Sequence, residues 1–464
     1  MNDSNQELPL SKKIWYGVGY LPDSILNNIY GSLIFMVYNV ELGLTAAAIG
    51  MVGLIIRLWD AFNDPFIGNL SDKTRSRWGR RHPYIISGTL SGALSMLLFL
   101  NPPQSLGATG LWWYLLIAAF LYYTAFSIYS VPFFALGLGM SSNEKDRAGL
   151  MGWRVAANNL VLCAIVPIVP MLIYNGWMGR SSMESLSRIA LILAALITVT
   201  GLLAARFLPK SQLEPGEGIK FPGLIDGFTC VFKNRPFLIA TGIVSLALFG
   251  LIVGWSMIFY LNLSVVFTVG ELAARKAAAT QLGAVTGFAG AFTGMVIAPF
   301  VATLSNQVGR KRLLTSAIGL MILSYLLTPW LFTPVMPYLQ VVFNILFMSG
   351  ITCVFVLTAP MVGEVCDVDE IDTGFRREGI FTAMFNLGFK ISIALTSLVS
   401  GLLISGSGFN AELLEQTDST VLFLRWSFAL VPVIFFVLCL YLNQIYPLNT
   451  ELINRLRLEK ITKR

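Results

Sequence analysis

The chain has 464 residues, of which 55% are hydrophobic and only 12% are charged, and its formal net charge is +7. Soluble domains carry about 25% charged residues, so this composition excludes an ordinary soluble domain and indicates a protein surrounded mostly by lipid. The excess positive charge lies mainly in short connections between apolar runs, which indicates membrane topology and not nucleic-acid binding. The five cysteines have no paired spacing, so neither a disulfide framework nor a cysteine metal site is predicted.

Twelve apolar segments, each close to the ~20 residues that cross a bilayer, follow one another along the chain. They cover residues 14–39, 44–71, 83–101, 111–138, 149–174, 187–208, 236–262, 281–304, 313–333, 337–362, 378–404 and 420–446. The connection 209–235 is rich in Pro, Gly and charge. It separates an N-terminal half, 1–208, from a C-terminal half, 236–446, which a tail at 447–464 follows. We therefore predict an all-α membrane protein with twelve transmembrane helices in two six-helix halves.

Lys and Arg gather in the connections that follow even-numbered segments, above all at 73–81, 210–235 and 310–312, and in both termini. By the positive-inside rule this asymmetry places both termini in the cytoplasm. The first residues, MNDSNQELPLSKK, are polar and show no cleavable signal pattern. We expect a multi-pass protein of a bacterial inner membrane.

A loop motif repeats in the two halves. GNLSDKTRSRWGRR follows the second segment, and a weaker echo, ATLSNQVGRKR, follows the eighth. Corresponding motifs six segments apart indicate a parallel repeat, as in the major facilitator architecture. The pattern at Gly68, Asp72 and Lys73 resembles the signature loop of that superfamily, which is thought to hold helix ends together in one conformation. Asp72 and Arg80 are therefore gating candidates; the alternative is a basic loop that only fixes the topology.

The second segment carries Arg57, Asp60 and Asp64 in an apolar context, with Asn63 beside them. Asp60 and Asp64 are four residues apart and share one face of a helix. A carboxylate at bilayer depth is costly unless it is paired or binds a cation. Oxygen ligands suit a hard cation such as Na⁺, and two close carboxylates could instead share and release a proton. The structural alternatives are pairing of Asp60 with Arg57 and of Asp64 with Lys390.

Ionisable residues inside other membrane segments are functional candidates by default. Asp23 follows Pro22 in the first segment, Arg154 opens the fifth, and Lys390 lies deep in the eleventh. The fourth segment adds the hydroxyl and aromatic candidates Ser127, Ser130 and Phe134. The structural alternatives are that Asp23 caps a broken helix and that the aromatic residues only pack the bundle.

Enzymatic chemistry is not predicted. The one histidine, His82, lies in the basic loop, and the sequence has no Ser-His-Asp arrangement and no Walker motif. We therefore expect neither catalytic residues nor an ATP-driven pump, and no cofactor beyond a coupling ion.

Three stretches resemble the glycoside–pentoside–hexuronide:cation symporters, and together the resemblance covers nearly the whole chain. They are WDAFNDPFIGNLSDKTRSRWGRRHPY, VPFFALGLGMSSNEKDRAGLMGWR and MVGEVCDVDEIDTGFRREGIFTAMFNLGFK. The resemblance implies a cation site on Asp60, Asn63, Asp64 and Ser127, in which the two carboxylates hold Na⁺. It also implies a substrate site that includes Asp23, Arg154 and Lys390.

Two departures from the family pattern concern the substrate site. Ser130 stands where a melibiose-transporting member has a further substrate-binding acid. Phe134 and, in the tenth segment, Phe355 stand where that member stacks the sugar on tryptophans. The resemblance therefore implies a more apolar pocket. We expect it to bind a glycoside other than a galactoside, or an amphiphile.

The sequence thus predicts a cation-coupled symporter of a sugar or glycoside that works by alternating access, with Na⁺ or else H⁺ as the coupling ion. One alternative is a sodium-dependent lysophospholipid symporter with the same mechanism, since the family includes such a branch. Another is a non-transporting receptor or scaffold, against which the retained acids, arginine and lysine argue. The expected partners are a small organic substrate, a monovalent cation and membrane lipid, with no nucleic acid, and we expect a monomer.

Overall fold

The computed structural model describes residues 8–140, 144–175, 181–209, 234–373, 378–410, 413 and 415–448. These residues are mostly helical, with no strand among them. Lipid offers the backbone no hydrogen-bond partners, so a spanning segment must satisfy its N–H and C=O groups internally, as an α-helix does. The all-α fold class is confirmed. Most of the predicted connection 209–235 and of the tail 447–464 lies outside the described residues.

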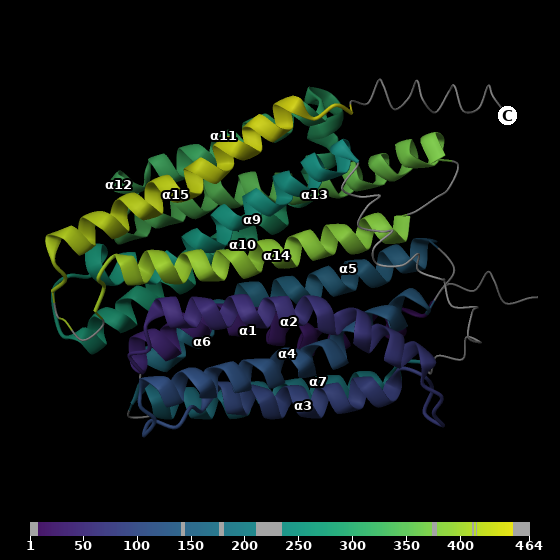
Figure 1. The fold of residues 1–464 in the computed structure, drawn as a ribbon, viewed down its shortest axis with the longest axis horizontal. Helices are drawn as coiled ribbons and strands as arrows, with labels where there is room; N and C mark the ends of the chain where they lie inside the picture. Colours follow the sequence, from purple (N-terminus) through teal and green to yellow (C-terminus); the bar gives the residue numbers. More distant parts are fainter. Residues whose placement is uncertain are drawn as a thin grey trace, which may run out of the picture. The chain divides into compact units, whose positions relative to one another are not determined.

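The N-terminal half is a series of long helices (Figure 1), several of which contain a proline or continue into π-helical turns. In chain order they are α1 (Leu10–Phe35), the π-helix η1 (Met36–Glu41), α2 (Ala46–Lys73), α3 (His82–Leu100), α4 (Ala108–Leu138), α5 (Glu144–Leu160), the π-helix η2 (Val161–Ile165), α6 (Val166–Tyr174) and α7 (Ser182–Phe207).

The C-terminal half has the same character. Its elements are α9 (Arg235–Leu261), the π-helix η3 (Asn262–Val266), α10 (Leu272–Val308), α11 (Arg310–Leu326), α12 (Thr328–Leu331), the 3₁₀-helix η4 (Pro337–Leu339), α13 (Gln340–Thr373), α14 (Glu378–Gly406) and α15 (Asp418–Ile445). Local sequence explains several starts. Asn234 caps α9 by accepting a hydrogen bond from Phe237 N (3.0 Å), and Gly309, at φ +90°, supplies the left-handed turn before α11.

Ten of the twelve predicted segments are found as helices long and apolar enough to cross a membrane, within the part of the chain that the structure describes. The other two, 14–39 and 313–333, are also helical, as α1 and α11. α1 is less apolar because Asp23, Asn27 and Asn28 lie in its middle. α11 has only 17 residues and begins with Arg-Lys-Arg. α1 therefore departs in its polarity, and α11 in its length.

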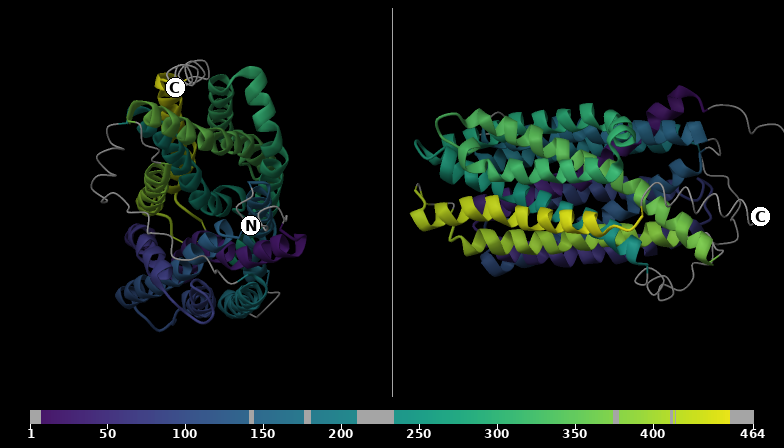
Figure 2. Two further views of the ribbon diagram at one scale, coloured as in Figure 1. Left: turned by 90° about the vertical axis from the view of Figure 1, so that its right-hand side faces the viewer. Right: turned by 90° about the horizontal axis from the view of Figure 1, so that it is seen from above.

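The chain divides into two compact units. The first contains residues 1–218, 269–288 and 409–414, and the second contains residues 219–268, 289–408 and 415–464. The main boundary falls within the predicted connection 209–235. The beginning of α10 belongs to the first unit and its remainder to the second. Within each unit the helices run side by side along a common direction (Figures 1 and 2).

The two units repeat one packing scheme. In the first, α1 packs against α5 and α7, and α3 packs against α4 and α7. In the second, α9 packs against α14 and α15, and α11 packs against α13 and α15. The leading helices α1 and α9 both continue into π-helices, η1 and η3. Two copies of one six-segment unit explain these correspondences, as expected for the major facilitator fold.

The first unit is held together by close helix–helix contacts at small residues. α3 crosses α4 at Gly88, where an added Cβ would lie 2.6 Å from Tyr129 N and 2.7 Å from Tyr129 Cα. Around this crossing Tyr129 and Phe133 form a buried aromatic stack with Tyr16 of α1. Without a hydrophobic drive between helices in lipid, such backbone proximity and packing supply the attraction.

This crossing predicts that Gly88→Ala destabilises the protein. The new methyl group would meet the backbone of α4, so the two helices must separate, at a cost of about 1–3 kcal/mol. The measurement is thermal unfolding of the purified protein in detergent. Gly31→Ala on α1 is the matched control, because nothing lies within 4 Å of its added Cβ. Equal melting temperatures for the two variants would contradict the close α3–α4 contact.

Candidate functional site

Asp60 lies in the middle of α2 and is 1% exposed. The hydroxyl of Ser127, on the neighbouring helix α4, is fully buried and donates to Asp60 Oδ1 over 3.3 Å. Asn63 is buried one turn further along α2, and Asp64 is partly buried beside it. The helical spacing of three and four residues places these side chains along one face of α2, against α4. The structure therefore brings Asp60 and Ser127 into contact, with Asn63 and Asp64 on the adjoining turn.

The chemistry of this group, which we call the Asp60 site, suits a hard monovalent cation. Two carboxylates, an amide and a hydroxyl offer oxygen ligands only. The amide nitrogen of Asn63 is buried and has no hydrogen-bond acceptor among the described residues. No cluster of three or more His, Cys, Asp or Glu side chains that could hold a metal ion occurs in the described ranges. The donor set is thus the one expected for an alkali cation and not for a transition metal.

The alternative pairing of Arg57 with Asp60 is not formed. The Arg57 guanidinium lies over the ring of Tyr123, 4.7 Å from its centroid. It takes part in no ion pair with the other residues that the structure describes. A cation–π contact leaves the guanidinium charge without a carboxylate partner.

A second polar group, the Asp23 cluster, contains Asp23, Tyr20, Ser130, Phe134 and Arg154. Asp23, on α1, is 5% exposed, and Ser130 and Tyr20 lie within electrostatic range of its carboxylate. Arg154, on α5, donates to the Tyr20 hydroxyl over 3.3 Å. Its guanidinium lies 4.7 Å from the centroid of the Tyr20 ring and 4.6 Å from that of Phe134. Four residues predicted for the substrate site are thus brought together by α1, α4 and α5.

Two features of the Asp23 cluster differ from the sequence-based interpretation. α1 continues through Pro22, from Leu10 to Phe35, so Asp23 lies inside a helix and does not cap a broken one. Tyr20 was not predicted, and it contacts both Asp23 and Arg154. Its only signal in the sequence is its place one turn before an intramembrane acid. Aromatic residues at that spacing usually pack, so the pattern alone does not distinguish Tyr20.

The Asp60 site and the Asp23 cluster are electrostatically linked. The charge of Asp64 acts unfavourably on Asp23. Like charges in a low-dielectric bundle disfavour joint ionisation, so a cation bound near Asp64 would ease the burial of charge on Asp23. The remaining predicted substrate residues, Phe355 on α13 and Lys390 on α14, are both partly buried and belong to the second unit.

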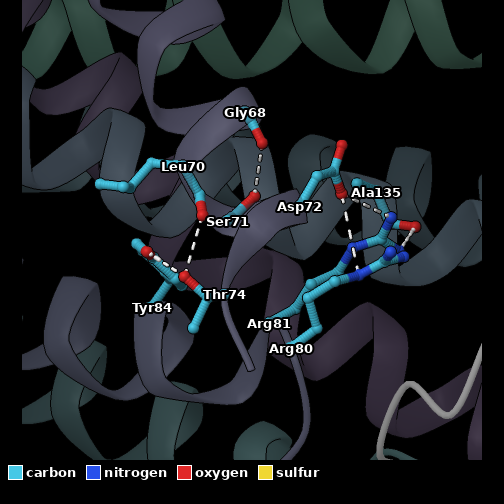
Figure 3. A network of polar contacts seen from close by, with 9 residues as sticks. All are labelled: Gly68, Leu70, Ser71, Asp72, Thr74, Arg80, Arg81, Tyr84 and Ala135. Atoms are coloured by element: carbon cyan, nitrogen blue, oxygen red, sulfur yellow. Dashed lines mark hydrogen bonds and ion pairs between the residues drawn. The ribbon is translucent and has the colours of Figure 1, made fainter. Parts of the chain in front are cut away.

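The predicted gating residues form a network at the end of α2 (Figure 3). Asp72 accepts from Arg81 NH2 at 3.4 Å and lies 3.9 Å from Arg80 Nε. Arg81, which the sequence-based selection omitted, also donates to the carbonyl of Ala135 near the end of α4. Burial and the adjacent Arg80 charge lower the pKa of Arg81, and Asp72 acts in the opposite direction. Arg81 therefore joins the ends of α2 and α4, with Arg80 as a more distant neighbour of Asp72.

The second unit has a counterpart at the corresponding loop. Arg310, the first residue of α11, forms an ion pair with Glu364 of α13. Its guanidinium lies 5.9 Å from the ring centroid of Tyr446, just after α15. In both units an arginine at the start of the third helix reaches the fourth. The acid has moved from the second helix in the first unit to the fourth helix in the second unit.

A buried ion pair that the sequence did not indicate lies at the other end of the first unit's helices, away from the Asp72 network. Glu41, between the first two membrane segments, accepts from Lys276 Nζ (2.7 Å) and from the Tyr174 hydroxyl (2.8 Å). Ser182 donates to its other oxygen. The side chains of Glu41 and Lys276 are each only 12% exposed. This Glu41 cluster connects η1, α6, α7 and the beginning of α10.

The Glu41 cluster predicts a pH-dependent stability. Burial raises the pKa of Glu41, but the hydrogen bonds from Lys276 and Ser182 and the Lys276 charge outweigh it, so the pKa is lowered. A lowered folded-state pKa contributes stability above the ordinary glutamate value of about 4.3. That contribution is lost as the pH falls through the folded-state pKa. Glu41→Gln should therefore destabilise the protein at pH 7 by about 1–3 kcal/mol, and the difference should disappear in acid.

Melting temperatures in detergent at pH 7 and below pH ~4 test this expectation. Glu184→Gln is the control, because Glu184 forms an exposed i,i+4 pair with Arg188 that contributes little. A difference between wild type and Glu41→Gln that is the same at both pH values would show that the carboxylate charge is not what stabilises the cluster.

Comparison with known proteins agrees with this arrangement. The family model described as "MFS/sugar transport protein" matches residues 15–450. The chain is 27% identical to the uncharacterized symporter YnaJ of Bacillus subtilis, over 97% of this chain and 94% of that protein. It is 26% identical to the glucuronide carrier protein homolog of Escherichia coli, over 94% of this chain and 92% of that protein.

Solved structures share the fold at lower sequence identity. The crystal structure of the nucleoside transporter NupG superimposes with a TM-score of 0.62 at 17% identity, and the match covers 93% of this chain and 98% of that one. A family model that matches nearly the whole chain, and relatives aligned over more than nine tenths of their length, agree with the transporter fold. The chain belongs to the MFS/sugar transport protein family, within the glycoside–pentoside–hexuronide:cation symporters of the major facilitator superfamily.

Proposed function

We propose that this protein is a sodium-coupled symporter of a sugar or glycoside that works by alternating access. The observation that carries the proposal is the buried Asp60–Ser127 contact, with Asn63 and Asp64 beside it and Asp23 within electrostatic range. The all-oxygen Asp60 site would bind the cation, and the neighbouring hydrogen-bonding groups would bind the substrate; a symporter needs both sites. Family membership and the relative named as a glucuronide carrier support the substrate class.

Coupling follows from charge. With the cation site empty, carboxylates at Asp60 and Asp64 are costly inside the bundle, and Asp64 disfavours a charged Asp23. A bound cation offsets this charge and favours an ionised Asp23, which can then accept hydrogen bonds from substrate hydroxyls. Cation and substrate therefore raise each other's affinity, as linkage requires. When cation and substrate are both bound, the buried carboxylate charges are compensated, and the protein can change conformation.

The Asp23 cluster suits a polyhydroxyl ring. Asp23 accepts hydrogen bonds, the edges of the Arg154 guanidinium donate them, and Ser130 can do either. The Phe134 ring offers an apolar surface beside them. Lys390 and Phe355 complete the proposed substrate site by resemblance to the family. An amphiphile such as a lysophospholipid would instead use the aromatic residues for its chain, and competition between a lysolipid and a glycoside panel distinguishes the two substrates.

Conformational exchange would require the Asp72 network to form and break. We assign Asp72, Arg80 and Arg81 a gating role, on the side of the membrane that the basic loops place in the cytoplasm. In this proposal the protein acts as a monomer in a bacterial inner membrane, with both termini cytoplasmic.

The network predicts unequal effects of its two arginines. Arg81→Gln should slow transport about tenfold, which corresponds to roughly 1.4 kcal/mol, because it removes the contacts to both Asp72 and Ala135. Arg80→Gln should have a smaller effect, since its nitrogen is 3.9 Å from Asp72. Initial rates of uptake into vesicles, with the protein amounts matched, provide the measurement. Equal slowing by both variants would argue against Arg81 as the residue that holds the helix ends.

The Asp60 site predicts Na⁺-dependent stabilisation. A ligand that binds only the folded state raises its stability by about 2.7 kcal/mol at a hundred times its Kd. Wild type should therefore melt at a higher temperature in NaCl than in choline chloride of equal concentration, and Asp60→Asn should lose this shift. Glu184→Gln, which removes an exposed acid elsewhere, should keep it.

Uptake provides the second readout for the same variant. Asp60→Asn should no longer accumulate substrate under a sodium gradient, and unaltered sodium-driven uptake would exclude Asp60 as the coupling residue. Absence of a Na⁺ shift in wild type, together with uptake driven by a pH gradient, would replace Na⁺ by H⁺ in the mechanism.

A further inference from the structure

We propose that Tyr20 is a positioning and specificity-determining residue: its phenol keeps Asp23 and Arg154 apart, so that both remain available to a neutral polyhydroxyl substrate. This inference rests on the proposed function and names the substrate class of the same site. It begins from a residue that the sequence patterns did not identify.

The geometry places the phenol between the two charges. Arg154 NH2 donates to the Tyr20 hydroxyl over 3.3 Å, and the same hydroxyl interacts with Asp23. A phenol has one donor and can also accept, so the hydroxyl that accepts from the guanidinium keeps its proton for the Asp23 carboxylate. Asp23 and Arg154 themselves form no ion pair within 4.0 Å in the part of the chain that is described.

Separation of the two charges matters for binding. A direct carboxylate–guanidinium pair is short and frequently bidentate, and it would occupy the groups that a ligand needs. To bind, a substrate would have to replace this strong ion pair by two weaker hydrogen bonds, one to each charged group. The phenol uses only one guanidinium N–H and one carboxylate lone pair. The other N–H groups of Arg154 and the other lone pairs of Asp23 therefore remain available to a substrate.

The rings set the direction of the free donors. Tyr20 and Phe134 lie 4.7 and 4.6 Å from the Arg154 carbon and contact the guanidinium through their faces. Stacking on aromatic rings leaves the in-plane N–H groups as the route to hydrogen bonds. A ligand therefore needs acceptor oxygens near that plane and a hydroxyl donor for Asp23. Neighbouring hydroxyls on a sugar ring meet both needs.

Charge then selects among sugars. The charges of Asp23 and Arg154 sum to zero, so these two side chains supply no excess positive charge that would hold a carboxylate. A uronate would bring its carboxylate close to Asp23. The two negative charges would repel each other, and the cluster has no excess positive charge to compensate the repulsion. The Asp23 cluster, considered without Lys390 of the second unit, thus favours neutral glycosides over uronides.

The test measures binding and transport with defined probes: the methyl glycosides of glucose, galactose and xylose, and methyl glucuronide. Wild type should bind at least one neutral glycoside more tightly than methyl glucuronide. Tyr20→Phe should raise the KM for that glycoside about tenfold, the loss typical of a hydrogen bond to a charged group, with little change in maximal rate. Its preference for the neutral glycoside should narrow, because Asp23 and Arg154 can then pair with each other and no longer distinguish the two substrates.

Tyr16→Phe is the matched control. Tyr16 lies one turn earlier on α1, is fully buried, and its hydroxyl has no hydrogen-bond partner among the described residues. Its removal should leave KM and preference unchanged. Retention of the NaCl-dependent melting shift in Tyr20→Phe shows that the variant is folded with its cation site intact.

The outcomes separate the two proposals. Unchanged KM and preference in Tyr20→Phe, with wild type binding a glycoside, would overturn the role of Tyr20 and leave the symport proposal in place. Tighter binding of methyl glucuronide by wild type would overturn the neutral class. If no probe binds wild type although Na⁺ stabilises it, the sugar assignment itself fails, and the inference about Tyr20 fails with it.

Discussion

Burial of carboxylates in a helix bundle is the constraint on which the first unit depends. Asp60 and Asp23 are almost completely buried; Arg57 lies over the ring of Tyr123, and Arg154 donates to the hydroxyl of Tyr20. Lipid and packed helices cannot solvate such charges, so each depends on hydroxyls, on amides or on what it binds. In the proposed mechanism, acids held this way lower the stability of the empty protein and make that stability respond strongly to a bound cation.

The overall architecture could be predicted because the signals for membrane helices are long and strong. Twenty-residue apolar runs and the repeated loop motif lead to two six-helix halves, and ten of the expected spans are found as such. α1 and α11 are not among these spans for different reasons: α1 carries polar residues, Asp23 among them, and α11 has only 17 residues. The residues proposed for the Asp60 site could be grouped on one face from their spacing alone, since i, i+3 and i+4 positions must be neighbours on a helix.

Contacts between helices could not be obtained in that way. The pairing of Arg81 with Ala135, of Glu41 with Lys276, and of Tyr20 with Arg154 joins residues 54, 235 and 134 positions apart. Spacing carries no information about which helices pack together or how they are rotated. Charge in a loop also has several uses, so the sequence singled out Arg80 where the structure gives the shorter contact to Arg81. Tertiary packing determines which of two neighbouring arginines contacts the acid, and patterns in a single sequence do not report tertiary packing.

The repeated packing of the two units shows where they have diverged. Both place an arginine at the start of their third helix, yet its acidic partner is on the second helix in one unit and on the fourth in the other. Each solution joins helix ends, and only the first leaves its acid more than half exposed, since the Asp72 side chain is 57% exposed and that of Glu364 is 19%. An exposed ion pair is easily exchanged for water, whereas a buried one is costly to break. The first unit therefore has the more readily opened junction, and a conformational change that separates helix ends would begin at Asp72.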